Sequence, residues 1–333
     1  MDRFASTNVF VISEALYCST ILGAVNNNVA AEGLDARPAG EHGHLGGRLT
    51  ACCCGDTVAA VRSRWGRSGL GCDGGHLKND GDGLMPRMFV EHGGVLWAAG
   101  QTLDLPEGAA RHVQVLRLQP GDALTLFDGR GGEWAAEVRH MGRRDVSVCL
   151  HEHQPADREL SVPVTLVVGM PANDRMDALV EKATELGAAV VQPLVCQRSV
   201  LRLEGDRATK KVAHWQGVAV AASEQCGRTR VPDIRPVLTF RQWMDSSPLP
   251  GAQRGVLSFA PQRPVSGWLA ALDIQAPGSA GVAFLSGPEG GLHPEEEARA
   301  IECGWLPVGL GPRVLRADTA PLMALSLVNG LLG

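Results

Sequence analysis

The fold class is indicated most clearly by one stretch near the C-terminus, Val282-Ala283-Phe284-Leu285-Ser286-Gly287-Pro288-Glu289-Gly290-Gly291. Its first four residues are continuously apolar, as in a strand that is buried on both faces of a parallel sheet. The glycine-rich loop that follows leads to Pro294, a residue suited to the first position of a helix. The stretch therefore predicts a strand, a loop and a helix of an α/β domain.

The same alternation of strands and helices extends over residues 162–333. Apolar runs predict further strands at 164–168, 188–191, 255–259 and 307–310. Apolar positions at helical spacing predict helices at 174–187, 206–226, 294–303 and 320–332. This order of elements favours a mostly parallel sheet that is covered by helices on both faces.

Two glycine-rich loops, 286–291 and 309–313, follow strands of this predicted sheet. In open α/β sheets ligands bind at the carboxyl ends of the strands, and glycines let the backbone approach a flat ligand closely. Neither loop has the glycine spacing of a dinucleotide site or a nucleotide triphosphate site. The residues alone leave two interpretations, a ligand site or two tight strand-to-helix turns.

Residues 85–160 predict a small β-barrel domain, because short apolar stretches recur about every ten residues with turn signals between them. The predicted strands are 113–118, 123–127, 134–138 and 146–150, and the loop 128–132 predicts a hairpin turn. Arg139, Arg143 and Arg144 cluster near the next turn. They fit either a solvated turn or a contact with an RNA backbone.

The first 84 residues differ from the rest, with five of the nine cysteines and weak periodicity. Three of these cysteines are adjacent, Cys52, Cys53 and Cys54, whereas zinc sites usually separate paired cysteines by two to four residues. We therefore predict no metal site, with zinc as the alternative. Residues 1–84 are interpreted as an extension, either disordered or translated from a wrongly assigned start, since Met85 would be a natural first residue.

Composition and charge exclude several classes of protein. The chain of 333 residues is 44% hydrophobic with a net charge of −5, which excludes a wholly disordered chain and one held to nucleic acid by bulk charge. The sequence has no apolar run of about 18 residues and no clearly basic start, so we predict neither a membrane helix nor a signal peptide. The scattered cysteines after residue 85 favour a cytoplasmic location.

Motifs in several parts of the chain resemble one family. The loop Gly287-Pro288-Glu289-Gly290-Gly291 and the later stretch LGPRVLRADTA, residues 310–320, resemble the knot region of the SPOUT methyltransferases. The closer resemblance is to the RsmE family of bacterial 16S rRNA (uracil-N3) methyltransferases. It rests on PRMFV at 86–90, KATELG at 182–187, RSV at 198–200 and AASEQCGR at 221–228, in the family's order. The resemblance covers residues 85–333.

The resemblance implies a fold and an activity. It implies a PUA-like RNA-binding β-barrel over residues 85–160 and a SPOUT methyltransferase domain with a trefoil knot over residues 161–333. The implied protein is a homodimer that binds S-adenosyl-L-methionine in the knot. The implied reaction is methylation of N3 of uridine 1498 in the 16S rRNA of the 30S subunit.

The resemblance also implies which residues form the site. The expected cofactor-binding residues are Leu285, Ser286, Gly287, Gly290, Gly309, Leu310, Leu315 and Ala320. The expected catalytic residues are Arg175, Glu224, Arg228, Glu289 and Arg316, in which a guanidinium would pair with phosphate or a uracil oxygen and a carboxylate would act as the base. The resemblance adds Arg198 as an RNA-binding residue, beside Arg139, Arg143 and Arg144, which are expected from their clustering near one turn. The leucines also fit a core role, and Glu224 also fits an ion pair with Arg228 one helical turn on.

Three alternative functions stay open at this point. Another SPOUT methyltransferase would modify a ribose 2′-hydroxyl or a different base, and a non-catalytic RNA-binding or assembly protein would keep the fold without a cofactor. A nicotinamide-dependent oxidoreductase would need a glycine fingerprint that the sequence lacks. One residue also departs from the family, since Asp318 stands where glutamate is usual and gives the carboxylate a shorter reach.

Overall fold

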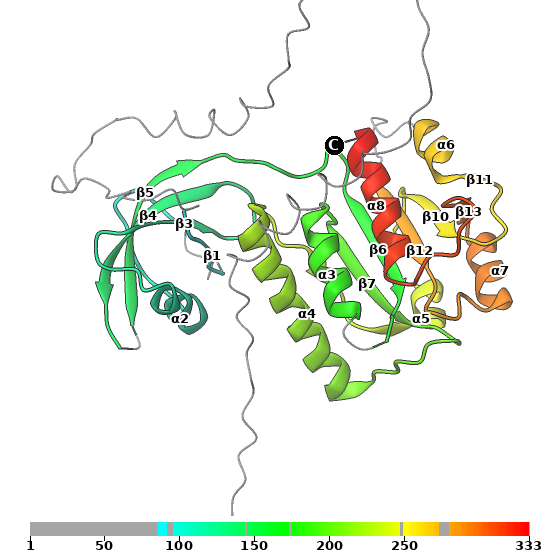
Figure 1. Ribbon diagram of the computed structural model, residues 1–333, viewed down its shortest axis with the longest axis horizontal. Coiled ribbons are helices and arrows are strands. Elements are labelled where there is room, and N and C mark those ends of the chain that lie inside the picture. Colours follow the sequence, from blue (N-terminus) through cyan, green and yellow to red (C-terminus); the bar gives the residue numbers. More distant parts are fainter. Residues whose placement is uncertain are drawn as a thin grey trace, which may run out of the picture. The chain divides into compact units, whose positions relative to one another are not determined.

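A computed structural model describes residues 85–91, 96–143, 145–172, 175–246, 249–272 and 280–332. The predictions made for residues 1–84 and for Arg144 lie outside the described residues. The described strands form two sheets, one of five strands within residues 87–154 and one of eight strands that begins at residue 164 (Figure 1). The domain bounds given above stay predictions, because the sheets show only which strands belong together.

The first sheet contains β1 (Arg87–Phe89), β2 (Thr102–Asp104), β3 (Ala123–Phe127), β4 (Glu133–Met141) and β5 (Val146–Gln154). The strand order is β1-β3-β4-β5-β2, and every pair is antiparallel except β1 with β3. Alternating side chains such as Leu124 and Leu126 form one core with helix α2 (Glu107–Val115). Residues 128–132 form the predicted hairpin turn between β3 and β4.

One prediction for this part of the chain was wrong. Residues 113–118, predicted as a strand, form the end of α2 and the turn that follows it. Ala110 and Val113 are buried three residues apart, whereas Val115 is 58% exposed, so the apolar residues follow helical spacing and not alternation. The helix begins after Pro106 with the acidic Glu107 in its first turn, which the electric dipole of the helix favours.

The second sheet is entirely parallel. Its strands are β6 (Val164–Gly169), β7 (Val190–Val195), β8 (Asp233–Ile234), β9 (Leu238–Thr239), β10 (Gln253–Leu257), β11 (Arg263–Pro264), β12 (Val282–Ser286) and β13 (Leu306–Gly309). Its helices are α3 (Arg175–Glu185), α4 (Gly205–Cys226), α5 (Phe240–Asp245), α6 (Val265–Ala270), α7 (Pro294–Glu302) and α8 (Thr319–Leu332). Every strand and helix predicted for this region overlaps an observed one, while α5, α6, β8, β9 and β11 were not predicted.

Helices cover both faces of this sheet, as predicted (Figure 1). Along β6, Val164, Leu166 and Val168 pack in one core with residues of α3, α4, α6 and α8. Val167 points to the opposite face, where it packs in a second core with residues of α5 and α7. The alternation along a single strand therefore confirms the α/β class.

The strand order determines which loops lie together. The order is β11-β13-β10-β12-β6-β7-β8, with β9 also paired to β7. Because all these strands are parallel, the loops that follow β6, β12 and β13 lie at one edge of the sheet, which we call the carboxyl edge. The trefoil knot stays a prediction.

Strand β7 contains Pro193, which lies two residues beyond the strand predicted at 188–191. Pro193 is aligned with Val168 of β6 inside the sheet. On the other side, β7 pairs with β8 at Val190 and Val191 and with β9 at Leu194. The missing N–H of Pro193 therefore falls where the neighbouring strand changes, and the strand continues through it.

Candidate functional site

The loop after β12 makes a tight turn at the carboxyl edge. A Cβ atom on Gly287 would lie 2.4 Å from the backbone nitrogen of Leu292, so only glycine fits at that position. A Cβ atom on Gly169, at the end of β6, would lie 2.6 Å from the ring of Pro288. Close contacts between backbones therefore fix the course of this loop.

The loop after β13 has the same character. A Cβ atom on Gly309 would lie 2.6 Å from the ring of Pro261, and Gly311 has a φ of +99°, which side chains rarely adopt. The carbonyl of Arg316 accepts a hydrogen bond from the backbone N–H of Ala320 at 3.0 Å, which starts α8. The second loop is thus held between a close backbone contact and a helix start.

The predicted cofactor-binding residues differ in exposure. Leu285 is fully buried in the core below the loop, and Ser286 is 2% exposed. Five others are partly exposed or exposed at the loops: Gly287, Gly290, Leu310, Leu315 and Ala320. Gly309 is buried. The structure therefore gathers these residues at the carboxyl edge, with the leucine of β12 in a core position.

Glu289 joins the first glycine loop to the end of β6. Its Oε1 atom accepts a hydrogen bond from the backbone N–H of Ala172 at 2.8 Å and lies 3.6 Å from Nη1 of Arg175 at the start of α3. The Glu289 side chain keeps 28% of its surface exposed and the Arg175 side chain keeps 42%. The structure thus brings two of the predicted catalytic residues together, with a carboxylate that is held in place but accessible.

Arg198, in the segment after β7, holds the same loop. Its Nη1 atom donates to the carbonyl of Gly290 at 2.9 Å and to the carbonyl of Leu292 at 3.2 Å. A Cβ atom on Gly290 would lie 3.2 Å from the Arg198 side chain, which is tighter than an ordinary contact. Arg198 remains exposed, so this predicted RNA-binding residue also supports the glycine loop.

Two buried polar atoms at the loops have no hydrogen-bond partner among the described residues. They are Oγ of Ser286 and Oδ1 of Asp318. The only other such side-chain atoms in the described chain are Nε of Arg87 and Nε2 of His151, both in the first sheet. Because buried polar atoms are nearly always paired, two unpaired ones, at the end of β12 and just before α8, fit a site that a polar ligand completes.

Arg228 has its donors occupied within the protein. Its Nη1 atom donates to the carbonyls of Thr184 and Ala188, both at 2.9 Å, and its Nε and Nη2 atoms pair with the carboxylate of Glu159. The residue is 4% exposed. Since Ala188 precedes β7, Arg228 lies at the amino edge of the sheet. Helix α3 connects the two edges, and its 11 residues span about 16 Å, so Arg228 is about that far from the glycine loops.

Glu224 lies near the same amino edge. Its Oε1 atom accepts a hydrogen bond from the backbone N–H of Phe89 at 2.8 Å, and Oε2 lies 3.7 Å from Nδ1 of His112. Burial raises the pKa of Glu224, although the Phe89 N–H and the charges of His112 and Arg87 act in the opposite direction. Within one chain, neither Glu224 nor Arg228 is brought to the glycine loops.

The remaining predicted arginines lie at different places. Arg316 is exposed in the loop before α8. Arg139 lies 3.7 Å from Glu137 on β4, and Arg143 is exposed in the turn after β4. These last two belong to the first sheet, so the site residues predicted from sequence occupy two separate parts of the chain.

Sequence reasoning missed Gly169, the last residue of β6, and Ala172, which lies after it; they contact the first glycine loop at Pro288 and Glu289. A usable signal was their place directly after a predicted buried strand, where ligand loops occur. The described residues contain no group of three or more side chains that could hold a metal ion. None of the described helices is long and apolar enough to span a membrane.

Comparisons with known families agree on one class of protein. The model of the RNA methyltransferase domain matches residues 158–329, and the model of the RNA methyltransferase PUA domain matches residues 105–148. The ribosomal RNA small subunit methyltransferase E of Synechocystis is 34% identical, over 69% of this chain and 74% of the relative. The protein of the same name from Bacillus subtilis is 31% identical, over 74% of this chain and 96% of the relative.

Solved structures give the same result. The structure of a ribosomal RNA small subunit methyltransferase E from Neisseria gonorrhoeae bound to S-adenosyl methionine has a TM-score of 0.66 and 33% identity. It covers 73% of this chain and 96% of the relative. A putative methyltransferase from Legionella pneumophila in complex with the same cofactor has a TM-score of 0.67 and 30% identity, and covers 74% of this chain and 98% of the relative.

Proposed function

The chain belongs to the ribosomal RNA small subunit methyltransferase E family, and from this we propose that it transfers a methyl group from S-adenosyl-L-methionine to N3 of uridine 1498 in 16S rRNA. The observation that carries the proposal is the pair of glycine loops with the unpartnered atoms Ser286 Oγ and Asp318 Oδ1. The cofactor bound by the Neisseria and Legionella relatives supports the choice of methyl donor.

The residues at the carboxyl edge fit this cofactor. The hydroxyl of Ser286 and the carboxylate of Asp318 would bond its polar groups, and the backbone at Gly309 and the side chain of Leu310 would lie against its flat ring. The other proposed contacts are Leu285, Gly287, Gly290, Leu315 and Ala320. When bound, the cofactor supplies a methyl group on a positively charged sulfur atom, which is a strong methyl donor.

The protein must prepare the acceptor, because N3 of uracil carries a proton that has to leave. We assign the role of proton acceptor to Glu289, which the Ala172 N–H and Arg175 hold in one orientation. The exposed guanidinium of Arg316 would pair with a uracil oxygen and stabilise the negative charge that develops on the ring. The rest of the catalysis is alignment of donor and acceptor.

We assign Glu224 and Arg228 a different role from the one predicted. Arg228 fixes the turns around α3 and β7 by bonding the carbonyls of Thr184 and Ala188. Glu224 bonds the backbone of β1 through Phe89. Both residues would therefore hold the chain in shape and not touch the reacting atoms.

The further parts of the proposal concern partners. Arg198, Arg139 and Arg143 would contact the RNA backbone, since the net charge of −5 requires local basic groups for RNA binding. The proposed substrate is the 30S subunit, the proposed assembly is a homodimer, and the proposed location is the cytoplasm, where ribosomes are built. The trefoil knot belongs to the same proposal.

The proposal is tested by methylation of 30S subunits from a strain that lacks this gene. The full chain is added with labelled S-adenosyl-L-methionine, and the modified nucleoside is located by mass spectrometry. We expect 3-methyluridine at position 1498 alone. Subunits from the wild-type strain, which already carry the modification, are the control and should take up no label.

Other outcomes would contradict parts of the proposal. Label on a ribose hydroxyl or on another base would agree with the fold but contradict uridine N3 as the methyl acceptor. Absence of label with intact cofactor binding would overturn the substrate as well, and absence of cofactor binding would favour a non-catalytic RNA-binding protein. A chain of residues 85–333 measured beside the full chain shows whether residues 1–84 contribute.

A further inference from the structure

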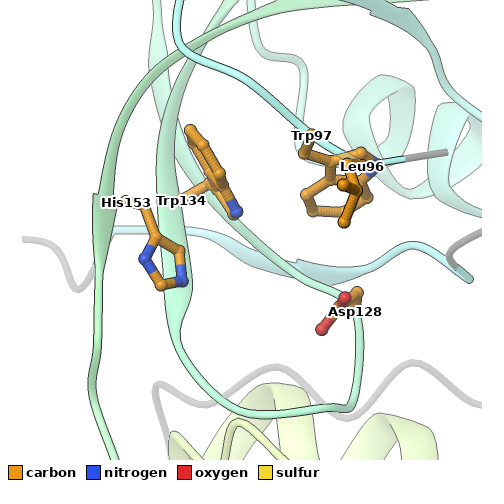
Figure 2. Close-up of a pocket in the computed structure, with 5 residues that line it drawn as sticks. All are labelled: Leu96, Trp97, Asp128, Trp134 and His153. Atoms are coloured by element: carbon orange, nitrogen blue, oxygen red, sulfur yellow. The ribbon is translucent and has the colours of Figure 1, made fainter.

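A hollow in the first sheet is separate from the glycine loops. It is lined by Leu96, Trp97, Asp128, Trp134 and His153 and has a volume of about 340 Å³. Figure 2 shows Trp134 and His153 side by side, with Trp97 across the opening from them and Asp128 at one end. Pockets for small ligands begin at about 300 Å³ and combine apolar rings with a few polar groups. This aromatic hollow therefore suits one flat ring with polar edges.

The rings of the aromatic hollow are held by the backbone. Trp134 of β4 and His153 of β5 are directly paired across the two strands, with ring centroids 5.0 Å apart and planes inclined by 50°. A Cβ atom on Gly132 would lie 2.3 Å from Nε2 of His153, so the glycine makes room for that ring. His153 is exposed, which leaves its ring surface available for stacking, whereas the partly exposed Trp134 offers the N–H at the edge of its ring.

The polar groups of the hollow can form hydrogen bonds with the edge of a bound ring. Oδ1 of Asp128 accepts a hydrogen bond from the backbone N–H of Arg130 at 3.0 Å, and an ionised carboxylate has lone pairs left for further donors. Figure 2 shows the indole nitrogen of Trp134 on the side of its ring that is nearer to Asp128. The hollow is thus lined by a carboxylate acceptor and an indole N–H donor.

Positive charge lies next to this hollow. Arg130 and Arg230 are both exposed, and their backbones form a β-bridge. The guanidinium of Arg230 lies against Gly131, where a Cβ atom would be 3.1 Å from its Nη2 atom. The guanidinium of Arg230 beside this hairpin, with the exposed Arg130 two residues after Asp128, is suited to the phosphates next to a bound nucleotide.

We propose that the aromatic hollow binds one unpaired guanine of the RNA substrate. Aromatic side chains commonly stack single-stranded bases, which expose the edges that polar groups read. Guanine presents two adjacent N–H donors to a carboxylate and an oxygen to an N–H donor. Uracil presents an oxygen on each side of its single N–H, so one oxygen would face the Asp128 carboxylate. The inference rests on the proposed function only in that RNA is the substrate.

This guanine is a different nucleotide from the methylated one. The hairpin that carries Asp128 bonds to the chain near Arg228: Gly131 N–H donates to the carbonyl of Thr229 at 3.2 Å, and Gly132 N–H donates to the carbonyl of Ala156 at 3.0 Å. Arg228 lies at the amino edge of the second sheet, whereas the glycine loops lie at the carboxyl edge. Within one chain, the hollow therefore lies at a distance from the glycine loops where the uracil would react.

The test uses the full chain and fluorescein-labelled RNA nonamers of uridine that carry guanosine, inosine or uridine at the centre. Fluorescence anisotropy at one fixed salt concentration gives each Kd. We expect guanosine to bind about tenfold more tightly than uridine, with inosine between them because it lacks the exocyclic amino group. Asp128→Asn should abolish this preference, and His153→Ala should weaken binding of the guanosine RNA about fivefold.

A matched carboxylate serves as the control. Asp145 lies in the turn at the other end of β4 and β5 with 75% of its side chain exposed, and Asp145→Asn should keep the preference for guanosine. Equal binding of the three RNAs by the wild-type protein would overturn the inference. Unchanged preference in Asp128→Asn, with circular dichroism showing a folded protein, would overturn it as well.

Methylation kinetics on 30S subunits separate this inference from the proposed function. Asp128→Asn should raise KM about tenfold, with kcat and cofactor affinity unchanged, because the hollow lies away from the reacting atoms. A wild-type protein that prefers guanosine RNA but labels no uridine would contradict the proposed function and support guanine binding in the hollow. A wild-type protein that labels uridine, with KM unchanged in Asp128→Asn, would contradict guanine binding in the hollow and support the proposed function.

Discussion

The carboxylate of Glu289 accepts a hydrogen bond from the backbone N–H of Ala172, 2.8 Å away. The bond links the loop after β12 to the segment after β6, two adjacent strands of the parallel sheet. The same carboxylate lies 3.6 Å from Arg175 and is partly exposed. Glu289 can therefore support the loop and accept a proton, and the two roles can be separated by substitution.

Glu289→Gln should keep the hydrogen bond to Ala172 and remove the base. We expect cofactor affinity within about twofold of wild type and a fall in kcat of about 10²–10⁴, the usual contribution of a positioned base. Isothermal titration and single-turnover methylation measure the two quantities. Glu295→Gln is the control, because that side chain is 86% exposed. An unchanged kcat in Glu289→Gln would leave the residue with loop support alone.

Gly287→Ala should damage the cofactor site. The new Cβ atom would lie 2.4 Å from the nitrogen of Leu292 and 2.6 Å from the carbonyl carbon of Gly291, and backbone atoms cannot move aside cheaply. We expect a loss of about 1–3 kcal/mol in the free energy of unfolding and at least tenfold weaker cofactor binding. Gly217→Ala in α4, where a Cβ has open space, should instead add up to about 1 kcal/mol.

Ser286→Ala should separate binding from stability. The hydroxyl is buried without a partner in the described chain, so its removal should leave the free energy of unfolding unchanged or higher. Cofactor affinity should fall about fivefold to tenfold, as for one lost hydrogen bond of about 1 kcal/mol. Ser199→Ala is the opposite case: it leaves the buried N–H of Cys196 unpaired and should cost about 1–3 kcal/mol of stability.

Glu159→Ala should destabilise the fold severely. It leaves the buried guanidinium of Arg228 without its carboxylate, and breaking a buried ion pair costs about 3–5 kcal/mol. Urea unfolding followed by circular dichroism measures the loss. Asp233→Ala, which removes one partner of an exposed ion pair with Arg235, should lower the free energy of unfolding by less than about 1 kcal/mol. Equal losses from the two pairs would show that the Arg228 pair contributes no more than an exposed one.

The stability of the chain should depend on pH through Glu224. Burial raises the pKa of this carboxyl in the folded state. The stability that the protonated carboxyl contributes is therefore fully present below its ordinary pKa of 4.5 and is lost as pH rises through the raised pKa. Glu224→Gln keeps an acceptor for the Phe89 N–H but does not ionise. We expect the urea midpoint of the variant, relative to wild type, to rise between pH 4.5 and pH 8. A constant difference would contradict the assignment.

The α/β part of the fold could be predicted from the sequence because its buried strands read as continuous apolar runs. Val164–Val168 and Val282–Leu285 are such runs, and both form central strands. The helix over residues 113–115 was missed because Val113 and Val115 read as alternation when its start at Pro106 is overlooked. The two-residue strands β8, β9 and β11 are too short to carry a pattern.

The site was only partly predictable for a different reason. Glu289 and Arg175 meet because β12 and β6 are neighbours, which places the loop of one beside the helix start of the other. Arg228 is the last residue of a motif that resembles the family's, but its side chain is buried against carbonyls of a distant turn. Burial and pairing of this kind depend on tertiary contacts, and residue type and spacing do not encode them.

The centre of the second sheet has a consequence for how the chain folds. Val164 at the start of β6 is paired with Val282 at the start of β12, so the middle of the sheet joins distant parts of the chain. Closing so long a loop costs entropy before any contact repays it, which slows folding. During synthesis β7 can pair with β6 early, but the ribosome must release the chain through β12 before the other edge of β6 is paired. Until then, one edge of β6 remains open to the wrong strands.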